Sequence, residues 1–364
     1  MTSAGSEPYH GARPDRPGAP AARGNPATPR RPRRWARTVA FVLLGLFVLF
    51  LVGSVSTYFW ASGKLTKIGA LTEYSGRPVQ GGGTNWLIVG SDSRSTLTPA
   101  QKQQYHVGSV AGQRSDTILL LHYGASGPDL ISIPRDSYAT IPAYTDSSGA
   151  THGASKNKIN AAYDLGGPQL LVRAVEQATD VRIDHYLEIG FLGVVNVVNA
   201  VGGVDMCLPS AVHDSYSGAD LPAGCQTLNG QQALALVRSR YSLPDSDISR
   251  MADQQDFVSA MVQSTLRPGV LGNPFVFYPL LAAMLDSVAV DDGTSVWSLL
   301  DLAWNSKTIT GGRGTVGTVP IADQGYQVSG VGSTVVWNSA KAQQLFAAVN
   351  ADEAIPAGLL NSLG

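Results

Sequence analysis

The chain has 364 residues, a formal net charge of −1 and 44% hydrophobic residues. This length and apolar content allow one large domain with appendages, and the lack of an overall basic excess argues against nucleic acid as a partner. The charge is unevenly distributed. Residues 1–37 carry eight Arg against Glu7 and Asp15, a balance of +6, which leaves about −7 for the rest of the chain.

The N-terminal region predicts a tail followed by a membrane anchor. Residues 1–38 are rich in Pro, Gly, Ala and Arg, so we expect a disordered basic cytoplasmic tail. Residues 39–60 carry no charge, and at about 1.5 Å per residue a helix of this length crosses a bilayer core of roughly 30 Å. Because Arg is concentrated before this stretch, we expect a single-pass type II protein of the cell membrane with an extracellular main domain.

A cleaved signal peptide is the alternative interpretation of this stretch, with Ser54–Ser56 as a small-x-small cleavage site. The apolar run is longer than the usual signal-peptide core of about 7–15 residues. Tyr58, Phe59 and Trp60 also resemble the aromatic belt found at membrane interfaces. These two features favour an uncleaved transmembrane signal anchor.

The main domain is expected to follow a short stalk. Residues 61–83 end in three glycines and read as this stalk, and residues 84–364 read as the extracellular domain. Short apolar runs rich in β-forming residues predict strands at Trp86–Val89, Thr117–Tyr123, Leu130–Ile133, Tyr186–Ile189, Val204–Leu208 and near Gly314–Pro320. Apolar residues at helical spacing predict helices at Gln169–Ala178, Phe191–Ala200, Gly230–Arg238 and Ile248–Leu266. Such a mixture predicts an α/β layered fold in which helices cover a sheet.

The first three predicted strands are flanked by polar clusters that each pair an Asp with an Arg. The clusters are Gly90–Arg94 after the first strand, Arg114–Thr117 before the second, and Ile133–Asp136 after the third. In an antiparallel meander these three positions share one edge of the sheet, so the acids and the guanidinium groups would converge there. Converging Asp can ligate Mg²⁺, and converging Arg can grip phosphate oxygens. The alternative is three separate surface ion pairs, each worth about 0–1 kcal/mol.

A second basic cluster contains Arg238 and Arg240, followed by Asp247 and Arg250. Residues two apart on a helix point in nearly opposite directions, so Arg238 and Arg240 can face one site only if the helix ends between them. Pro244 is consistent with such an ending. The alternative is that Arg at a helix end merely complements the helix dipole, for about 0.3–1 kcal/mol.

Cys207 and Cys225 are the only cysteines. Both lie beyond the anchor in an expected oxidising compartment, so we predict a disulfide. In the chain-entropy model, closing a loop of about 19 residues stabilises the fold by roughly 3 kcal/mol. Two buried free thiols are the alternative, and a metal or redox role is disfavoured because no Cys-x-x-Cys pattern occurs.

Other familiar chemistries have no sequence support. The chain contains neither the Gly-x-Ser-x-Gly motif of serine hydrolases nor the P-loop motif of NTPases. The six His are too far apart for a typical zinc site. The segment Lys156–Tyr163 is open to two interpretations, a solvated loop that enters a helix or part of the site.

Six strings in series resemble the LytR-CpsA-Psr family of cell-wall ligases over roughly Asn85–Leu266, about half of the chain. They are Gly90–Arg94, Arg114–Thr117, Ser132–Asp136, Lys158–Tyr163, Gly202–Asp205, and Leu228–Leu234 leading into Arg238–Arg240. The Ala, Gly, Pro and Arg bias is typical of an actinobacterial member.

The resemblance implies a three-layer αβα sandwich with a central mixed β-sheet, preceded by one transmembrane helix, and a hydrophobic pocket for a polyprenyl chain. It also implies a Mg²⁺-dependent phosphotransferase that moves a glycopolymer from its polyprenyl-pyrophosphate carrier to a sugar hydroxyl of peptidoglycan. Teichoic acid, capsule and arabinogalactan share this lipid-pyrophosphate handle, so each is a candidate polymer.

Carried over by position, the resemblance implies that Asp92 and Asp116 ligate the metal. It implies that the pyrophosphate is bound by Arg94, Arg114, Arg135, Arg238, Arg240 and Arg250, with Asp247 completing the site. This chain departs from the family at Asp253, where relatives often have a second Arg before a Gln pair, so the role of Asp253 stays open.

Cleavage of a pyrophosphate linkage puts negative charge on the transferring and leaving oxygens, which Arg and Mg²⁺ would stabilise. The catalytic candidates are therefore Arg135, with Asp136 or Asp247 as the base for the acceptor hydroxyl. Two other functions stay open. One is a non-catalytic surface scaffold or regulator that binds wall polymer, and the other is a polyprenyl-pyrophosphate pyrophosphatase that uses water as acceptor.

Overall fold

The computed structural model describes residues 34–91, 98–105, 115–239, 260, 264, 267–309 and 314–361. The chain divides into two units, Met1–Ser54 and Val55–Gly364. Helix α1 (Arg34–Lys64) begins in the first unit and ends in the second. Its segment Arg37–Lys64 is long and apolar enough to cross a membrane, in agreement with the expected anchor.

A seven-stranded sheet forms the centre of the second unit. Its order is β1 (Thr66–Ile68), β14 (Val288–Asp291), β9 (His185–Gly190), β2 (Thr84–Ser91), β3 (Ser115–Gly124), β4 (Gly127–Ser132) and β15 (Thr315–Thr318). Three neighbouring pairs are parallel, namely β1 with β14, β2 with β9, and β4 with β15. The other three pairs are antiparallel, so the sheet is mixed, as predicted.

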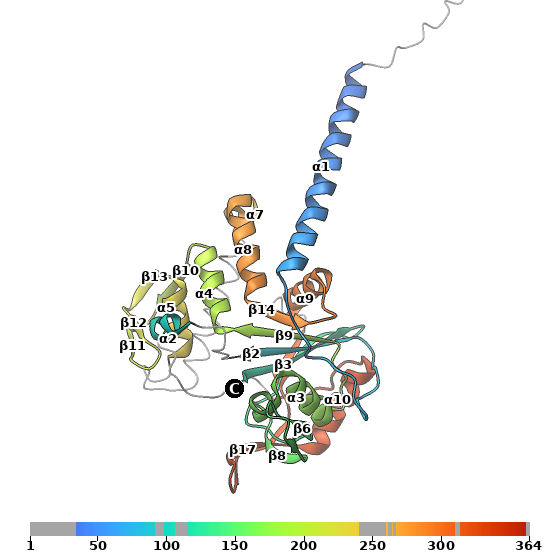
Figure 1. Cartoon of the computed structure of the whole chain (residues 1–364), viewed down its shortest axis with the longest axis vertical. Coiled ribbons are helices and arrows are strands. Elements are labelled where there is room, and N and C mark those ends of the chain that lie inside the picture. The colour runs from blue at the N-terminus through green and yellow to red at the C-terminus, as the bar shows by residue number, and fades with distance from the viewer. Residues whose placement is uncertain are drawn as a thin grey trace, which may run out of the picture. The chain divides into compact units, whose positions relative to one another are not determined.

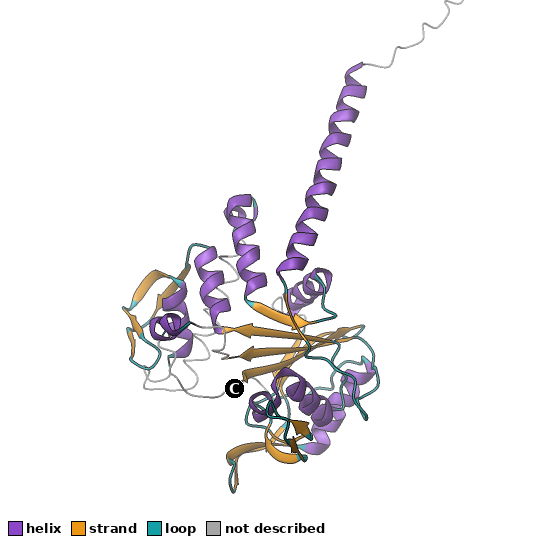
Figure 2. Cartoon of the chain, in the orientation of Figure 1, coloured by secondary structure: helices purple, strands orange, loops and turns teal. Residues whose placement is uncertain are grey.

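Helices cover both faces of this sheet, which gives three layers (Figure 2). One face packs against α3 (Ala161–Thr179) and α10 (Ser339–Ala351) and includes Leu87 of β2. The opposite face includes Trp86 and packs against the end of α1, α8 (Pro274–Asp286) and α9 (Val296–Thr308). Trp86 and Leu87 are both fully buried because successive residues of a strand point to opposite faces. This explains why β2 is a nearly continuous apolar run.

A side lobe follows the sheet strand β9 and comprises residues 191–238. It contains α4 (Phe191–Ala200), β10 (Val204–Leu208), β11 (Val212–Asp214), β12 (Ala219–Leu221), β13 (Gly224–Leu228) and α5 (Gly230–Arg238). The strands form two hairpins, β10 with β13 and β11 with β12. These elements bury an apolar core of their own, centred on residues such as Val204, Leu228 and Leu236.

The remaining described elements are short. The two-stranded pairs are β5 (Tyr138–Ile141) with β8 (Ser155–Lys158), β6 (Tyr144–Thr145) with β7 (Thr151–His152), and β16 (Ile321–Val328) with β17 (Gly332–Trp337). Two short helices are α2 (Pro99–Gln104) and α7 (Pro268–Leu271).

The predicted strands and helices agree well with the described ones, although boundaries differ. The helix predicted at Gln169–Ala178 is the second part of α3, which is interrupted where Gly166 and Gly167 leave helical geometry. Pro168 follows this break and suits the first turn of a helix because its missing N–H needs no partner there. Of the helix predicted at Ile248–Leu266, the described residues Ala260 and Ser264 are helical.

The expected stalk differs from the observed structure. Residues 61–83 include β1, which is the edge strand of the main sheet, and Ala70, which is fully buried in the core. Arg77 also forms a 3.0 Å ion pair with the buried Glu176 at the end of α3. The segment is therefore part of the folded unit, which begins well before residue 84.

Candidate active site

The end of β2, the start of β3 and the end of β4 lie along one edge of the sheet, the edge at which strands end, as the predicted meander requires. The end of β9 lies there too. Strands β2, β3 and β4 are consecutive antiparallel neighbours, and Ser91 at the end of β2 lies opposite Ser115 at the start of β3. Ser91 also lies beside Gly190, the last residue of the parallel strand β9. The ends of β2 and β9 point to the same side in Figure 1. The chain segments that carry the three polar clusters therefore leave or enter the sheet at one edge.

The structure describes only part of the predicted site. The side chains of Arg135, Asp136 and Arg238 are described, and Asp116 is described as a backbone position in β3. The predicted residues outside the described part are Asp92, Arg94, Arg114, Arg240, Asp247, Arg250 and Asp253. Their roles stay predictions.

Arg135, Asp136 and Lys158 form a charged cluster just beyond β4. The Lys158 ammonium lies 2.9 Å from Oδ1 of Asp136, and Nε of Arg135 lies 3.8 Å from Oδ2 of the same carboxylate. The three side chains are between 26% and 41% exposed, so they are held in place yet accessible. Lys158 of the segment Lys156–Tyr163 thus contacts the predicted site residue Asp136, and its part in the site stays a prediction.

Backbone hydrogen bonds fix this cluster to the core. The amide of Asn160 donates to the carbonyl oxygen of Arg135 at 3.2 Å, and the amide of Val335 in β17 donates to that of Asp136 at 2.9 Å. Lys158 itself ends β8, where it pairs with Tyr138 of β5. The cluster is therefore held by elements distant in sequence, which a single-strand pattern does not reveal.

A hydrogen-bonded network that sequence reasoning missed lies at the same edge. Oε1 of Glu188 accepts a 2.6 Å bond from the Tyr163 hydroxyl, and Oε2 accepts a 3.0 Å bond from the Tyr186 hydroxyl. The Ser91 hydroxyl donates to the Tyr163 oxygen at 3.3 Å. The network therefore holds the last residue of β2, which directly precedes the predicted metal ligand Asp92 in the sequence. The available signal was an acid within the apolar strand run of β9.

The electrostatics of the network keep Tyr186 as a hydrogen-bond donor. Burial, reinforced by the nearby Glu188 carboxylate, raises the pKa of Tyr186 well above its ordinary value of 10. The Tyr186 hydroxyl therefore stays protonated at any physiological pH. Glu188 thus has both carboxylate oxygens engaged by tyrosine hydroxyls, an arrangement that orients a carboxylate.

Arg238 is the last residue of α5, and Ser239 has extended backbone geometry. The helix therefore ends between Arg238 and Arg240, which is the condition that we set for both to face one site. The Arg238 guanidinium donates a 2.9 Å bond from Nη1 to the carbonyl oxygen of Tyr105. This contact ties α5 to the segment that follows α2 on the way to β3.

Cys207 and Cys225 form a disulfide, as predicted. They lie directly opposite each other on the antiparallel strands β10 and β13 of the side lobe. The bond therefore closes the hairpin that precedes α5 and Arg238, so its role is structural.

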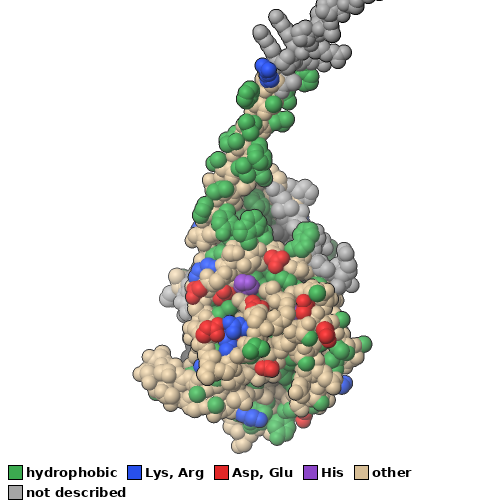
Figure 3. All heavy atoms as spheres, turned by 90° about the vertical axis from the view of Figure 1, so that its right-hand side faces the viewer, with side chains coloured by type: hydrophobic (Ala, Val, Ile, Leu, Met, Phe, Trp, Pro, Cys, Tyr) green, Lys and Arg blue, Asp and Glu red, His purple; other side chains and the backbone are tan. Residues whose placement is uncertain are grey.

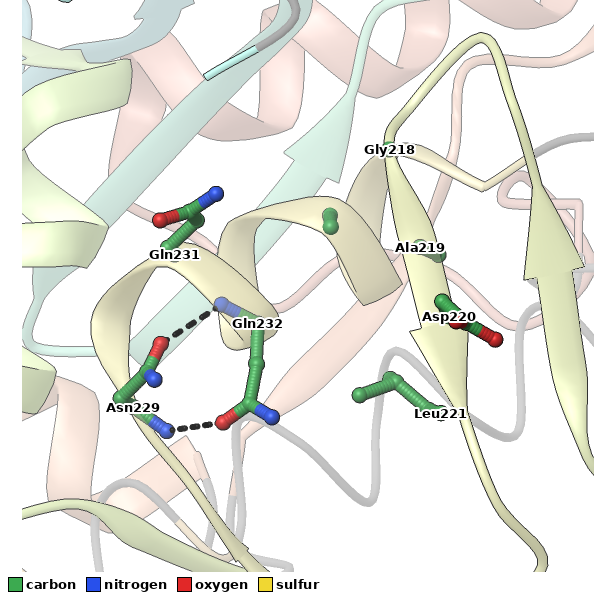
Figure 4. Close-up of a pocket in the computed structure, with 8 residues that line it drawn as sticks. Gly218, Ala219, Asp220, Leu221, Asn229, Gln231 and Gln232 are labelled. Atoms are coloured by element: carbon green, nitrogen blue, oxygen red, sulfur yellow. Dashed lines mark hydrogen bonds between the residues drawn. The ribbon is translucent and has the colours of Figure 1, made fainter. Parts of the chain in front are cut away.

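A pocket of about 230 Å³ lies on the side lobe between α5 and β12 (Figure 4). Asn229 and Gln232, which form the capping box of α5, lie at this pocket together with Asp220 of β12. Of the predicted site residues whose side chains the structure describes, Arg135, Asp136 and Arg238, none lines it. We therefore place the candidate site at the sheet edge and not in this pocket.

The sequence predicts a metal ion at Asp92 and Asp116. Among the side chains that the structure describes, no group of three His, Cys, Asp or Glu is arranged to hold a metal ion. The backbone of Asp116 nevertheless lies at the edge beside Ser91. Mg²⁺ commonly uses only one or two carboxylates together with substrate phosphates. The metal-binding role of Asp92 and Asp116 stays a prediction.

Comparison with known proteins identifies the family. The model of the LytR_cpsA_psr family matches residues 61–349. The chain is 39% identical over 292 residues to a probable cell wall biosynthesis protein, LcpB, of Corynebacterium glutamicum, covering 80% of this chain and 66% of LcpB. It is 34% identical to the cell wall biosynthesis protein LcpA of the same organism, covering 72% of this chain and 54% of LcpA. The chain thus spans a little under two thirds of one relative and about half of the other.

A solved structure supports the fold. The LytR-Csp2A-Psr enzyme from Actinomyces oris superposes with a TM-score of 0.55 at 22% identity, covering 79% of this chain and 96% of that one. The matched family model extends over most of the chain, from the end of α1 into α10. This chain belongs to the LytR-CpsA-Psr family.

Proposed function

We propose that the protein is a membrane-anchored phosphotransferase that attaches a glycopolymer to peptidoglycan. In the proposed reaction, the oxygen of a peptidoglycan sugar hydroxyl forms a bond to the glycopolymer-bearing phosphorus of a polyprenyl-pyrophosphate donor. The phosphoanhydride bond breaks, polyprenyl phosphate leaves, and a base accepts the hydroxyl proton. Two relatives are named cell wall biosynthesis proteins, and the Enterococcus faecalis relative TagU is named a polyisoprenyl-teichoic acid–peptidoglycan teichoic acid transferase.

The observation that carries this proposal is the accessible Arg135–Asp136–Lys158 cluster beside the shared edge of β2, β3, β4 and β9. Two cations within 4 Å of one carboxylate leave a net positive site. A diphosphate carries the opposite charge, and guanidinium groups bind its oxygens in pairs. The positive cluster therefore suits the anionic part of the donor.

Other residues of the proposed clamp are Arg94, Arg114, Arg238, Arg240 and Arg250, which the sequence assigns to the same region. We propose that Asp92 and Asp116 hold Mg²⁺. When bound, the ion would neutralise negative charge on the phosphates. The protein's own part is to grip the diphosphate, align the acceptor hydroxyl and take its proton.

Asp136 and Asp247 stay the candidates for the base. The contact with Lys158 at 2.9 Å and the nearby Arg135 make Asp136 well suited to position these two cations. These contacts give Asp136 a positioning role, so we favour Asp247 as the base. Substitution of the residue that acts as the base should remove the acid limb of the pH–rate profile, whereas substitution of a positioning residue should leave it in place.

Helix α1 gives the proposed reaction its location. We propose that it spans the cytoplasmic membrane with the folded unit outside, in line with the Arg that precede it. The donor is a membrane lipid, so anchoring raises its effective concentration at the site without additional contacts.

Substitution of Arg135 tests this function. The full chain, reconstituted in phospholipid vesicles, is assayed for polyprenyl phosphate and for polymer linked to peptidoglycan fragments. Arg135→Ala should lower turnover by about 100-fold or more, as loss of a group that stabilises transition-state charge does. Arg267→Ala is the matched control, because Arg267 forms an exposed 2.7 Å ion pair with Asp205 in the side lobe.

The products separate the alternatives. Release of polyprenyl phosphate without peptidoglycan fragments would identify a pyrophosphatase. Polymer binding with no lipid product would identify a scaffold. Equal turnover of Arg135→Ala and Arg267→Ala would contradict the site proposed here.

A further inference from the structure

Exposed aromatic and aliphatic side chains gather on α8 and α9. The side chains of Trp297, Leu300 and Trp304 on α9 are 66%, 55% and 72% exposed. On α8, Phe275 is 88% exposed and Tyr278 is 41% exposed. Large apolar side chains are usually buried, and a contiguous group of them on a surface marks an interaction site. We call these five residues the apolar surface.

Helical spacing places the α9 members on one face. Trp297, Leu300 and Trp304 follow an i, i+3, i+7 pattern, so they point the same way. Leu302 of the same helix is 7% exposed and packs in the core beneath the sheet. Helix α9 is therefore apolar both toward the core and toward the outside.

The apolar surface adjoins the last turns of α1. The Tyr58 ring stacks on Trp297 with centroids 6.0 Å apart. The Trp60 ring contacts Tyr278 edge-on at 5.7 Å, and the Thr57 and Tyr278 hydroxyl oxygens lie 2.8 Å apart. Hydrophobic side chains also gather where α1 meets the folded unit in Figure 3. Tyr58 and Trp60 belong to the aromatic belt, Tyr58–Trp60, that the sequence predicts at the membrane interface.

The contacts of α8 also set its direction. Thr57 meets Tyr278, and seven residues later Lys64 forms a 3.6 Å ion pair with Asp286. The end of α1 and α8 therefore run side by side in the same direction. Phe275 precedes Tyr278 by three residues, which at about 1.5 Å per residue places it about one turn nearer the apolar span of α1.

We propose that the apolar surface of α8 and α9 docks into the interfacial layer of the phospholipid bilayer that α1 crosses. Trp and Tyr are enriched in this layer because their rings accept an apolar environment on one side and a wet one on the other. The inference rests on the proposed anchoring of α1. It adds that the folded unit lies on the membrane through a second, non-spanning contact.

The occupant follows from continuity with α1. Because Trp297 and Tyr278 contact Tyr58 and Trp60 directly, any bilayer that reaches the belt of α1 also reaches them. Their residue types are those of amphipathic helices that lie in a membrane interface. A second copy of the chain is the competing occupant, and the experiment below separates it.

The test uses a fluorescent probe on the full chain in phospholipid vesicles. Leu300→Cys and, as control, Val79→Cys are labelled with an environment-sensitive dye, with the native cysteines paired in their disulfide. Val79 is a matched site because it is also apolar and 85% exposed, in the segment between β1 and β2. Quenching is measured with lipids that carry a nitroxide near the headgroup, and with aqueous iodide.

We expect the dye at position 300 to be quenched by the nitroxide lipid and shielded from iodide several-fold better than the dye at position 79. Equal iodide quenching at both positions would overturn the proposal. Shielding from iodide without lipid quenching would also overturn it, and would assign the surface to a second protein copy. None of these outcomes depends on enzymatic activity, so failure here is distinct from failure of the proposed function.

A second experiment introduces negative charge into the apolar surface. Leu300→Glu combined with Trp304→Glu puts two carboxylates into the interface, and Val79→Glu is the control. We expect the double variant to lose transfer from a vesicle-embedded donor but to keep transfer from a short-chain, water-soluble donor. Retention of the vesicle reaction would overturn the proposal. Loss of both reactions with an unchanged unfolding midpoint would also overturn it, because the effect would then not depend on the membrane.

Discussion

The Tyr163 hydroxyl lies 2.6 Å from Oε1 of Glu188 and links the start of α3 to strand β9 at the edge where the β2 and β9 strands end. The same hydroxyl also accepts a bond from Ser91. One phenol thus joins three elements beside the residues proposed to bind the donor. Its removal should loosen the end of β2 at Ser91.

Tyr163→Phe should therefore lower turnover about tenfold, because a small displacement of the end of β2 would misplace groups at the site. Tyr74→Phe is a matched control, because the Tyr74 hydroxyl donates at 2.8 Å to Glu176 at the far end of α3. Both variants should lose similar stability in denaturant unfolding, and only Tyr163→Phe should lose turnover. An equal loss of turnover in both would show that the Tyr163 effect is only structural.

Asp136→Asn tests whether the Asp136 carboxylate is the base or positions cations. As a positioning residue that holds Lys158 at 2.9 Å, its loss should raise KM for the donor and leave the acid limb of the pH–rate profile in place. As the base, its loss should remove that limb and lower kcat. Asp247→Asn should give the complementary result. Steady-state kinetics between pH 5 and 9 would distinguish the two.

Chelation tests the proposed ion. Turnover in vesicles should fall on addition of a chelator and return with excess Mg²⁺. Asp116→Ala should raise the Mg²⁺ concentration needed for half-maximal turnover, whereas Asp220→Ala should not, because Asp220 is an exposed partner of His213 on the side lobe. Turnover that is indifferent to chelation would rule out the metal assignment.

Loss of the disulfide should destabilise the side lobe. Bonds that close loops of about 15–20 residues contribute roughly 3 kcal/mol. Cys207→Ser with Cys225→Ser should therefore lower the thermal unfolding midpoint by several degrees, and reductant should have the same effect on the wild type. The double variant should then show no response to reductant. Unchanged midpoints would mean that the lobe core holds the hairpin without the bond.

The lowered pKa of Asp291 predicts that the folded protein loses stability in acid. Burial alone would raise its pKa, but bonds from His185, Thr294 and the Tyr186 amide outweigh this and lower the pKa to about 2. The folded value lies below the ordinary 3.8. The stabilisation is therefore present above about pH 4 and is lost as the pH falls toward 2, a change of about 2 kcal/mol.

Asp291→Asn should remove this component, so the variant should lose less stability than the wild type between pH 4 and 2. Asp292→Asn at the exposed neighbouring position serves as the control. Denaturant unfolding of the full chain in detergent measures the effect. Parallel pH curves for Asp291→Asn and the wild type would contradict it.

The sequence predicted those elements whose residues carry their own pattern. Strand β2 is apolar on both faces because Trp86 and Leu87 are both buried. Its continuous run of apolar residues was therefore easy to recognise in the sequence. Strand β1 has only three residues, two of them exposed, and its pairing with β14 joins positions more than 200 residues apart. Strand β16 is almost wholly exposed and carries no apolar run. Such strands are defined by long-range pairing, which local patterns do not encode.

The candidate site likewise combines residues that a local sequence pattern predicts with residues that only long-range packing brings together. Arg135 and Asp136 were predicted because their motif is contiguous and follows a clear strand. Glu188 was missed because its partners, Tyr163 and Tyr186, reach it through the packing of α3 on β9. The sequence alone does not single out Glu188, because the two hydroxyl groups that bind it come together only in the fold.

The direct connection from α1 to β1 limits how far the folded unit can move away from α1. Only Leu65, itself buried, separates the end of the helix at Lys64 from the first residue of the edge strand at Thr66. There is no slack tether between them. On the proposed function, this short connection keeps the enzyme close to the membrane, so an acceptor glycan must come near the membrane surface. Wall layers farther out would then be modified only while they are new and close to the cell.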